Sequence, residues 1–478
     1  MDSLELVAGL EVHLQVGAAG KLFCGCEVRY GAPPNSLVCP VCLGLPGALP
    51  VPRREAVGNA VRLAVALGCE VAERSGWARK SYGYPDLPKG YQVTQYERPL
   101  GTGGELPLIA GGAVRLRRLH LEEDAGKLVH GEDASLVDFN RAGVPLVEVV
   151  TEPEIGGPEE AEDFLRSLHR LAMALGVNEG NLEQGHLRCD ANLSLRRPGE
   201  PLGTKVEIKN LNSVRHVARA LAAEAGRQRE VLAAGGAVEE ETRGFDEAAG
   251  ETVPLRGKEA AADYRYFPEP DLPPLVVTAR EVERARCGLP EPPWQRQRRW
   301  TRAGVGEAEA VLLLAEPALA DYLDAAVAGR PGLEAAVARW LRGEVLAELH
   351  ARGEPAATAP PPAHLGRLVA SVEAGELSHS AAKRVLAAMW ESGEDPETAT
   401  ERLGLALVRD PGAIETWVDE ALAAEPQLAE RLRRGEEKLL DVFVGRVLGR
   451  SGGGADPRRV RRAVAAAVGS AQAAAVER

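Results

Sequence analysis

The sequence of 478 residues lacks any run of about 18 apolar residues, the length that a membrane-spanning helix requires. Its first residues, MDSLELVAGLEVH, also lack the basic segment and the apolar core of a secretory signal. We therefore expect a cytoplasmic protein that makes no contact with a membrane. In a reducing compartment, the seven cysteines favour metal binding or simple burial over disulfide bonds.

Common motifs of nucleotide and hydrolase chemistry are absent as well. The sequence contains no GxxxxGK[ST] phosphate-binding loop and no glycine-rich dinucleotide fingerprint after a strand. It also lacks the HExxH motif of zinc proteases. If the chain binds ATP, it must do so through a metal ion and cationic side chains dispersed along the sequence.

The chain as a whole carries more negative than positive charge. The formal net charge is −13, so the sequence as a whole does not indicate nucleic-acid binding. The exception is the C-terminal end, where arginines surround the segment SGGG. This basic end could contact RNA phosphates, or it could be a solvated helix face. The arginines concerned are Arg446, Arg450, Arg458, Arg459, Arg461, Arg462 and Arg478.

The length of the chain exceeds what one hydrophobic core supports, so we expect a multidomain α+β protein. The proline-rich segments PEPDLPP and LPEPPW mark a boundary near Glu291, beyond which strand patterns disappear. We predict an α/β domain over 1–291, an all-α domain over 292–404 and a small helical tail over 405–478. Within the first domain, residues 241–275 are predicted to be mostly irregular.

Hydrophobic periodicity predicts several individual elements. Alternation predicts a strand over Leu4–Val16, and helical spacing predicts helices over Ala56–Leu67 and Pro158–Leu175. The second helix has proline at its first position and acidic residues in its first turn. A further strand follows Arg188, and a further helix ends near Ala233.

Two polar residues stand on the first predicted strand. Glu11 and His13 are two positions apart, so both side chains leave the same face of the sheet. A carboxylate beside an imidazole is half of a metal site or an acid–base pair. The alternative is a half-exposed strand whose polar face happens to carry them.

Four cysteines form two close pairs. Cys24 and Cys26 are followed, after a short loop, by Cys39 and Cys42. Two such pairs suit a tetrahedral Cys₄ zinc site, which would be structural because four protein ligands leave no position for a substrate. Free structural cysteines are the alternative.

Three carboxylates lie side by side in HLEEDAGK, at Glu122, Glu123 and Asp124. Adjacent carboxylates repel one another, and a divalent cation would offset that repulsion because hard cations take oxygen ligands. A solvated acidic turn is the ordinary alternative. The nearby segment DFNRAGVPL, which leads into the apolar run Leu146–Val150, favours a structured loop that enters a buried strand.

Further cations and acids are candidates for phosphate handling. Lys80 and Lys89 lie in one tyrosine-rich segment, and Arg188 and Asp190 precede an alternating strand. Lysine and arginine are the side chains that a phosphate site needs. The alternatives are a surface loop packed by its tyrosines and an ordinary charged strand face.

Together, these motifs resemble the B-subunit family of the aspartyl/glutamyl-tRNA amidotransferases. The resemblance spans residues 9–275 in order, and the helical remainder agrees in layout. The motifs are GLEVH, RKSYGYPDLPKGYQVTQY, HLEEDAGK, DFNRAGVPLVEVVTEPE, RCDANLSLR, EIKNLNSVR and KEAAADYRYFPEPDLPPL.

The resemblance implies a fold, partners and a reaction. The fold would be an α/β cradle similar to glutamine synthetase-like folds, followed by a helical domain and a tail that touches tRNA. The partners would be the amidase (A) subunit, the small C subunit, misacylated tRNA-Gln or tRNA-Asn and the cognate synthetase. The chain would use ATP and Mg²⁺ to phosphorylate the misloaded side-chain carboxylate, and ammonia from the amidase would then displace the phosphate.

The resemblance also assigns roles to residues. Glu11, His13 and Glu123 would be the principal Mg²⁺ ligands, and Lys80 would hold phosphate or the substrate carboxylate. Lys89 and Arg188 would assist in nucleotide binding. Weaker candidates for the same metal site are Glu122, Asp124 and Asp190.

Two other functions compete with the ligase. One is a zinc-stabilised RNA-binding scaffold for a catalytic amidase. The other is a free-standing ammonia ligase for a small acid, which the basic tail argues against. The chain contains no amidase-type serine–lysine motif, so we do not expect it to release ammonia from glutamine.

Overall fold

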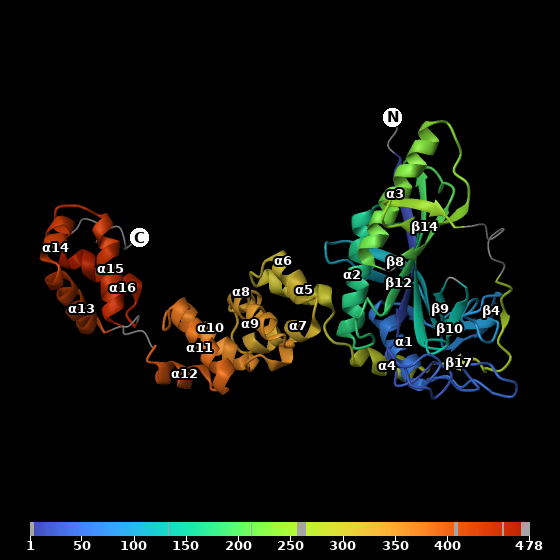
Figure 1. Ribbon diagram of the computed structural model, residues 1–478, viewed down its shortest axis with the longest axis horizontal. Coiled ribbons are helices and arrows are strands. Elements are labelled where there is room, and N and C mark those ends of the chain that lie inside the picture. Colours follow the sequence, from blue (N-terminus) through green and yellow to red (C-terminus); the bar gives the residue numbers. More distant parts are fainter. Residues whose placement is uncertain are drawn as a thin grey trace. The chain divides into compact units, whose positions relative to one another are not determined.

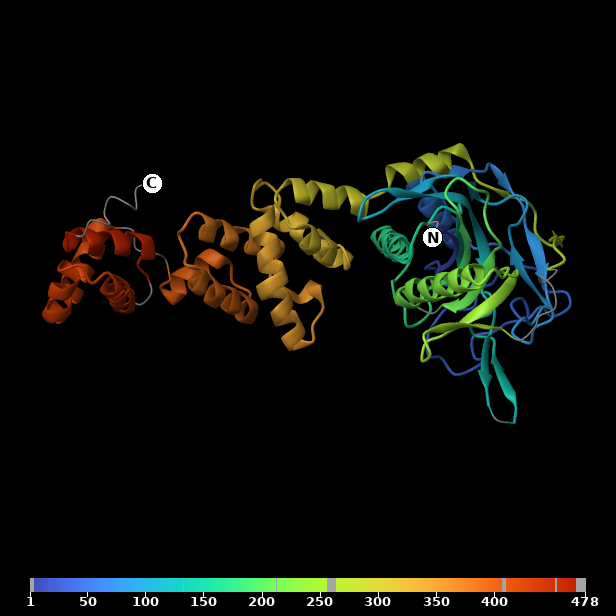
Figure 2. The same ribbon diagram turned by 90° about the horizontal axis from the view of Figure 1, so that it is seen from above.

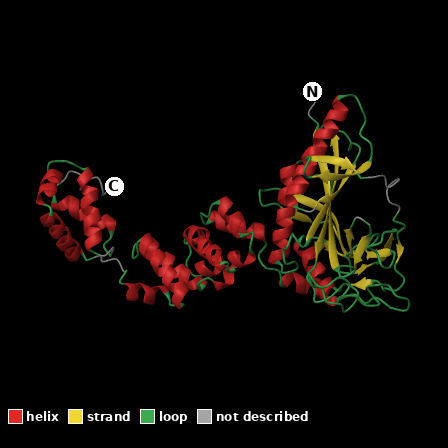
Figure 3. Cartoon of the chain, in the orientation of Figure 1, coloured by secondary structure: helices red, strands yellow, loops and turns green. Residues whose placement is uncertain are grey.

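The computed structural model describes residues 4–131, 133–211, 213–255, 264–405, 410–451 and 454–469. The chain forms two compact units, Met1–Arg296 and Gln297–Arg478. The described strands all belong to the first unit, and the described elements of the second are helices (Figure 3). The predicted change from mixed α/β to helical structure is therefore confirmed, whereas the further division of the helical region stays a prediction.

A ten-stranded mixed sheet forms the framework of the first unit. Its order is β15-β14-β13-β12-β1-β11-β8-β6-β2, with β7 paired to β8, so that β1 lies in the middle. The pairs are antiparallel except for β13 and β14. The strands are β1 Glu5–Gln15, β2 Glu70–Val71, β6 Gly101–Thr102, β7 Glu105–Pro107, β8 Ala113–Glu123, β11 Pro145–Thr151, β12 Leu187–Arg196, β13 Val206–Leu211, β14 Glu241–Asp246 and β15 Glu251–Pro254.

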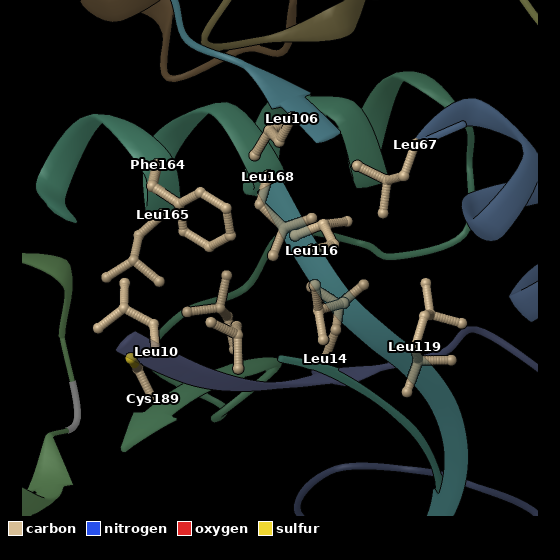
Figure 4. Close-up of a cluster of buried hydrophobic side chains, with 14 of the residues drawn as sticks. Leu10, Leu14, Leu67, Leu106, Leu116, Leu119, Phe164, Leu165, Leu168 and Cys189 are labelled. Carbon is tan, nitrogen blue, oxygen red and sulfur yellow. The ribbon is translucent and has the colours of Figure 1, made fainter. Parts of the chain in front are cut away.

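Helices cover one face of this sheet (Figure 1). They are α1 Arg54–Ala66, α2 Pro158–Ala174 and α3 Val214–Ala233, close to the predicted bounds. Figure 4 shows Leu10 and Leu14 of β1 in one apolar cluster with Phe164, Leu165 and Leu168 of α2. All five side chains are buried, and full burial of each contributes about 1.5–3 kcal/mol. The alternation of β1 therefore leaves its polar residues on the opposite face.

Smaller sheets and loops accompany the large sheet. Strands β4, β5 and β16 form a three-stranded sheet, β3 pairs with β17, and β9 and β10 form a hairpin that projects from the unit (Figure 2, teal, lower edge). Helix α4 follows. The bounds are β3 Arg74–Ser75, β4 Ala78–Ser81, β5 Tyr91–Thr94, β9 Lys127–His130, β10 Ser135–Asp138, β16 Phe267–Pro268, β17 Leu275–Val276 and α4 Ala279–Cys287.

The prediction that 241–275 is mostly irregular was wrong for its first part. Strands β14 and β15 form a hairpin that extends the large sheet. Fully buried Glu224 of α3 holds this hairpin, because it accepts a hydrogen bond from Thr252 at 2.7 Å and lies 3.4 Å from Arg243. A polar tertiary network of this kind leaves no apolar alternation in the sequence. Residues 256–263, which include Arg256, Lys258 and Asp263, lie outside the described residues.

The second unit is built from short helices. Three of the later ones, α12, α13 and α16, begin with an aspartate cap followed by proline, at Asp395, Asp410 and Asp456. Helices α13–α16 share a core of their own. The bounds are α5 Pro293–Arg302, α6 Glu307–Leu313, α7 Pro317–Val327, α8 Glu334–Trp340, α9 Leu346–Arg352, α10 Pro362–Glu373, α11 His379–Ser392, α12 Pro396–Leu403, α13 Pro411–Ala424, α14 Pro426–Arg433, α15 Lys438–Arg450 and α16 Pro457–Ala467.

In the part of the chain that the structure describes, no helix has the length and apolar content needed to cross a membrane.

Candidate active site and metal centre

The polar face of the large sheet brings together charged residues from four neighbouring strands. The register places Arg188 of β12 opposite His13 of β1, His13 opposite Glu148 of β11, and Glu148 opposite His120 of β8. Directly opposed residues share a face and stand in contact range. These residues therefore form one row across the middle of the sheet.

A compact cluster lies within this row. The Nε2 atom of His13 is 3.5 Å from Oε2 of Glu148 and 3.8 Å from Oε1 of Glu122, which comes from the end of β8. The Nε2 atom of His120 is 3.2 Å from the same Glu148 oxygen. Ligand atoms of His13, Glu122 and Glu148 all lie within 4.8 Å of one another, so these three residues could hold a metal ion.

The protonation of the cluster follows from this contact pattern. Burial would raise the pKa of Glu148, but the charges and hydrogen bonds of His120 and His13 hold it well below its ordinary value. Burial would lower the pKa of His13, but the hydrogen bond with Glu148 and the nearby carboxylates raise it. Glu148 is therefore the anion at the centre of the cluster.

A second group of acids, Glu11 and Asp190, lies next to the cluster, two residues away from His13 and Arg188 along their strands. Glu11 stands opposite Asp190 of β12, and its Oε1 accepts a 3.0 Å hydrogen bond from Nδ2 of Asn192. Burial raises the pKa of both acids, and in Glu11 the negative charge of Glu148 raises it further. Crowded carboxylates with raised pKa values are typical of a site that binds a cation or handles protons.

The three adjacent acids at the end of β8 turn in different directions. Glu122 faces the cluster, whereas Glu123 pairs with Lys89 and accepts a 2.8 Å hydrogen bond from the amide of Val93. Asp124 lies 2.8 Å from Arg188 and 3.2 Å from Arg141. The structure therefore brings Glu122 to His13, but it places Glu123 and Asp124 in separate ion pairs.

Lys80 lies at the edge of the cluster. Strand β4 carries it over the polar face, where its Nζ is 3.9 Å from Oε2 of Glu122 and 4.9 Å from the centre of the Tyr264 ring. Burial would lower its pKa, but the charges of Glu122 and Glu148 raise it. Gln92 of β5 donates a 2.7 Å hydrogen bond to Oε1 of Glu122 and fixes that carboxylate from the same side. Lys80 is therefore a cation that the charge of Glu122 keeps beside the acids.

The cysteines form a centre of their own. The sulfur atoms of Cys24, Cys26, Cys39 and Cys42 lie within 4.8 Å of one another, and none forms a disulfide. The Sγ atoms of Cys39 and Cys42 are 3.9 Å apart, which fits the ~3.8 Å expected around a tetrahedral zinc with bonds of about 2.3 Å. The donor set and its spacing therefore fit Zn²⁺.

Lys21 connects this centre to the loop before β11. Its Nζ lies 3.6 Å from Sγ of Cys42 and donates a 3.1 Å hydrogen bond to the carbonyl of Phe139. Gly143 has a φ of +89°, and a Cβ there would lie 3.5 Å from the Lys21 side chain. The amide of Gly143 donates to the carbonyl of Asp124. The RAGVP segment is thus a turn that contacts Lys21 of the cysteine centre on one side and Asp124, at the end of β8, on the other.

Comparison with known proteins places these residues in a family. A model described as the GatB/GatE catalytic domain matches residues 6–283, and one described as the GatB domain matches residues 321–468. The B subunit of the aspartyl/glutamyl-tRNA(Asn/Gln) amidotransferase from one strain of Thermus thermophilus is 50% identical, over 97% of this chain and 99% of the relative.

Two further relatives bear the same name. That of Anaeromyxobacter sp. (strain K) is 49% identical over 96% of this chain and 97% of its own length. The relative from Syntrophotalea carbinolica is 45% identical over 95% of this chain and 96% of its own length.

The chain belongs to the B-subunit family of aspartyl/glutamyl-tRNA(Asn/Gln) amidotransferases.

The resemblance drawn from the motifs is therefore confirmed. The acidic cluster, Lys80 and the cysteine centre all lie within the match to the catalytic domain of the family. The helical region from α8 to α16 lies within the second match, which begins inside α7.

Sequence reasoning missed two residues of the cluster. Glu148 and His120 both lie inside motifs of the family resemblance, yet composition and spacing did not single them out. The signal for Glu148 was a lone acid in the apolar run PLVEVV, where an unpaired charge would be costly. His120 stands two positions before Glu122, so both leave the same face of one strand.

Proposed function

We propose that the chain activates the side-chain carboxylate of glutamate or aspartate misloaded on tRNA-Gln or tRNA-Asn. An oxygen of that carboxylate attacks the γ-phosphorus of ATP, which gives an acyl phosphate and ADP. Ammonia then attacks the acyl carbon, phosphate leaves, and loss of a proton gives the amide. The observation that carries the proposal is the cluster of His13, Glu122 and Glu148 beside Lys80, within the part that matches the family's catalytic domain.

The acids of the cluster fit a divalent cation. Mg²⁺ takes oxygen ligands, and two carboxylates with His13 offer ligand atoms close enough to share one ion. When bound, Mg²⁺ would neutralise negative charge on the phosphates of ATP. Glu11 and Asp190 are further acids on the same face. Glu148 is thus a stronger candidate ligand than Glu123, which is engaged with Lys89.

The cationic residues would stabilise charge on the reactants. Lys80 stays protonated beside Glu122 and can hold a phosphoryl oxygen or the substrate carboxylate. Lys89 and Arg188 are further candidates for phosphate, but each would have to release a carboxylate, Glu123 or Asp124. Lys80 is therefore the principal candidate among the three.

We assign zinc to the four cysteines as a structural ion. Four thiolates complete a tetrahedral shell, so the ion would hold the loop and take no part in the reaction. The pKa of the Cys42 thiol is lowered, first because Cys24 donates a hydrogen bond to it, and Lys21 lowers it further. Cys42 is thus more readily present as a thiolate than Cys24 or Cys26, whose pKa values are raised.

The proposal also includes partners. The amidase (A) subunit would supply ammonia, the small C subunit would complete the heterotrimer, and the misacylated tRNA, with its cognate synthetase, would complete the assembly. The relatives are named as the B subunit of a tRNA amidotransferase, which supports a complex of several subunits. In this arrangement, the basic helix α16 of the tail would contact tRNA.

The test is transfer of label from γ-labelled ATP to glutamyl-tRNA-Gln by the complex. We expect the wild type to form labelled acyl phosphate, and Glu148→Gln or Glu11→Ala to lose at least a hundredfold in rate. Glu152→Gln is a matched control, because Glu152 pairs with Arg117 at the surface. Equal labelling in all variants would place the site elsewhere. No labelling with either glutamyl-tRNA or aspartyl-tRNA would favour the RNA-binding scaffold.

A further inference from the structure

The position of Lys80 depends on a strand that is not part of the large sheet. Strand β4 is the middle strand of the order β16-β4-β5, and Figure 1 shows it on the side of the large sheet away from α2 and α3. Among the described residues, the contacts of the Lys80 ammonium are long, 3.9 Å to Oε2 of Glu122 and 4.9 Å to the centre of the Tyr264 ring. The place of the ammonium is therefore set mainly by how the backbone of β4 is held.

The two faces of β4 carry different residues. Lys80 stands opposite Gln92 of β5, which donates a hydrogen bond to Glu122, so both side chains leave the face that lies over the acids. Its neighbour Arg79 stands opposite Val93 of β5 and Phe267 of β16 and leaves the other face. Contacts that hold Arg79 therefore also fix the backbone that carries Lys80.

A buried carboxylate holds Arg79 at two points. The Nε atom of Arg79 donates to Oε2 of Glu269 at 2.7 Å, and one terminal nitrogen donates to Oε1 at 2.8 Å. The same nitrogen donates to Asp271 at 3.2 Å. Glu269 is only 5% exposed, and although burial would raise its pKa, the hydrogen bond from Arg79 lowers it. Such a two-point bond uses the planar fork of arginine and has a defined geometry.

Aromatic rings and a main-chain bond complete this arrangement. The guanidinium carbon of Arg79 lies 4.2 Å from the centre of the Tyr91 ring and 5.7 Å from the centre of the Phe267 ring. The amide of Glu269 donates a 3.0 Å hydrogen bond to the carbonyl of Trp77, the residue before β4. The arginine–glutamate pair therefore joins β4 and β5 to the segment that follows β16.

We propose that Arg79 and Glu269 form a clamp that positions Lys80 over Glu122, so that Arg79 is a positioning residue for the proposed transfer of phosphate. A strand held from behind at two points keeps the side chains of its other face within a narrow range of positions. The inference rests on the proposed function for the role of Lys80, whereas the place of the Lys80 ammonium can be tested without it.

The experiment has two readouts, both made on the complex. The first is the rate of label transfer from γ-labelled ATP to glutamyl-tRNA-Gln, together with the KM for ATP. The second is the rate at which acetic anhydride acetylates Lys80, followed by mass spectrometry. Lys205 is the internal reference, because 57% of its side-chain surface is exposed, against 18% for Lys80.

The variants change the pair from its two ends. Arg79→Gln and Glu269→Gln each leave a polar side chain that can still form a hydrogen bond, but each removes one charge of the clamp. Arg115→Gln is the matched control, because Arg115 pairs with Glu154 at the surface.

We expect both variants to lower the rate of transfer about tenfold, to leave the KM for ATP within about twofold and to raise the acetylation of Lys80 about fivefold. In a Lys80→Met background, the same changes should cause no further loss, because a residue that acts through Lys80 has no effect once that lysine is gone. Arg115→Gln should match the wild type in both readouts.

Two results would overturn the clamp. One is unchanged acetylation of Lys80 in both variants. The other is a loss of rate that recurs in the Lys80→Met background, since Arg79 would then act on the fold and not through Lys80. A wild-type complex that transfers no label would refute the proposed function instead, and the acetylation of Lys80 would then decide the clamp by itself.

Discussion

At the scale of single residues, charge pairing decides most of the architecture of the site. Lys21 is fully buried, and the structure gives its ammonium a sulfur and a carbonyl as partners. A buried ammonium needs an anion to offset the loss of hydration. The thiolates of a zinc centre would supply that anion, so the lysine and the cysteines support each other.

The first prediction concerns Lys21→Met, which keeps the length of the side chain and removes its charge. We expect zinc to leave the variant about 10–100-fold faster under a chelator, as is usual when a metal site loses an outer partner. Release is measured with a chromogenic zinc chelator. Lys205→Met, at an exposed lysine, is the control. Equal release rates would show that Lys21 does not stabilise the metal-bound centre.

The second prediction concerns Glu148→Gln in the metal-free protein. Losing the charged partner of His13 and His120 should lower the free energy of unfolding by about 2 kcal/mol. The lowered pKa of Glu148 gives a contribution that is present above the ordinary value of 4.5 and lost as the pH falls through the folded value. The raised pKa of His13 gives a second contribution to stability. It is fully present below pH 6.5 and is lost as the pH rises through the pKa of the folded state.

The difference in the free energy of unfolding between wild type and Glu148→Gln should therefore be largest between pH 4.5 and 6.5. It should become smaller above that range. Urea unfolding in EDTA across about pH 4–9 measures it. A difference that is constant with pH would mean that the pair does not titrate as proposed.

At the scale of elements, hydrogen bonds join the loop of the cysteine centre to the turn before β11. Asn140 donates from Nδ2 to the carbonyl of Pro33 at 2.7 Å and accepts from the amide of Leu37 at 2.8 Å. Asn35 makes a parallel set of bonds to Asp138 and Phe139. The asparagine of the DFNRAGVPL motif therefore holds the cysteine loop.

The third prediction concerns Asn140→Ala. Loss of the side chain should leave the Leu37 amide without its acceptor and raise its hydrogen-exchange rate roughly fivefold, equivalent to about 1 kcal/mol of local stability. Amides of the central strand β1 should keep their protection and serve as the internal control. Unchanged exchange at Leu37 would show that the loop is held by other contacts.

At the scale of the whole molecule, the helical tail has its own core. Phe443, Val447 and Val460 are fully buried in a cluster formed by α13–α16 and the segments that join them. This supports the proposal that residues 405–478 act as a separate module. Arg478 lies outside the described residues.

The fourth prediction concerns removal of residues 406–478. We expect the truncated chain, in complex with its partners, to bind tRNA more weakly and with a shallower dependence on salt, because fewer phosphate contacts release fewer counterions. Filter binding at several salt concentrations measures both. An unchanged affinity and slope would assign tRNA binding to other parts of the chain.

The sequence by itself determined the elements and the chemistry of their residues. Apolar periodicity located β1, α1, α2 and α3 because burial on one face imposes a local period. Cysteine spacing indicated the four-cysteine cluster, and long motifs identified the family. These signals are local, or they depend on residue type alone.

Only the tertiary structure decided which charges meet. Glu122, Glu123 and Asp124 are adjacent in the sequence, yet they face His13, Lys89 and Arg188, because alternation and the end of β8 turn them apart. Glu148 and His120 reach the cluster because strand register sets residues from distant segments side by side. Register depends on the packing of the whole sheet, and therefore no local pattern in the sequence reveals it.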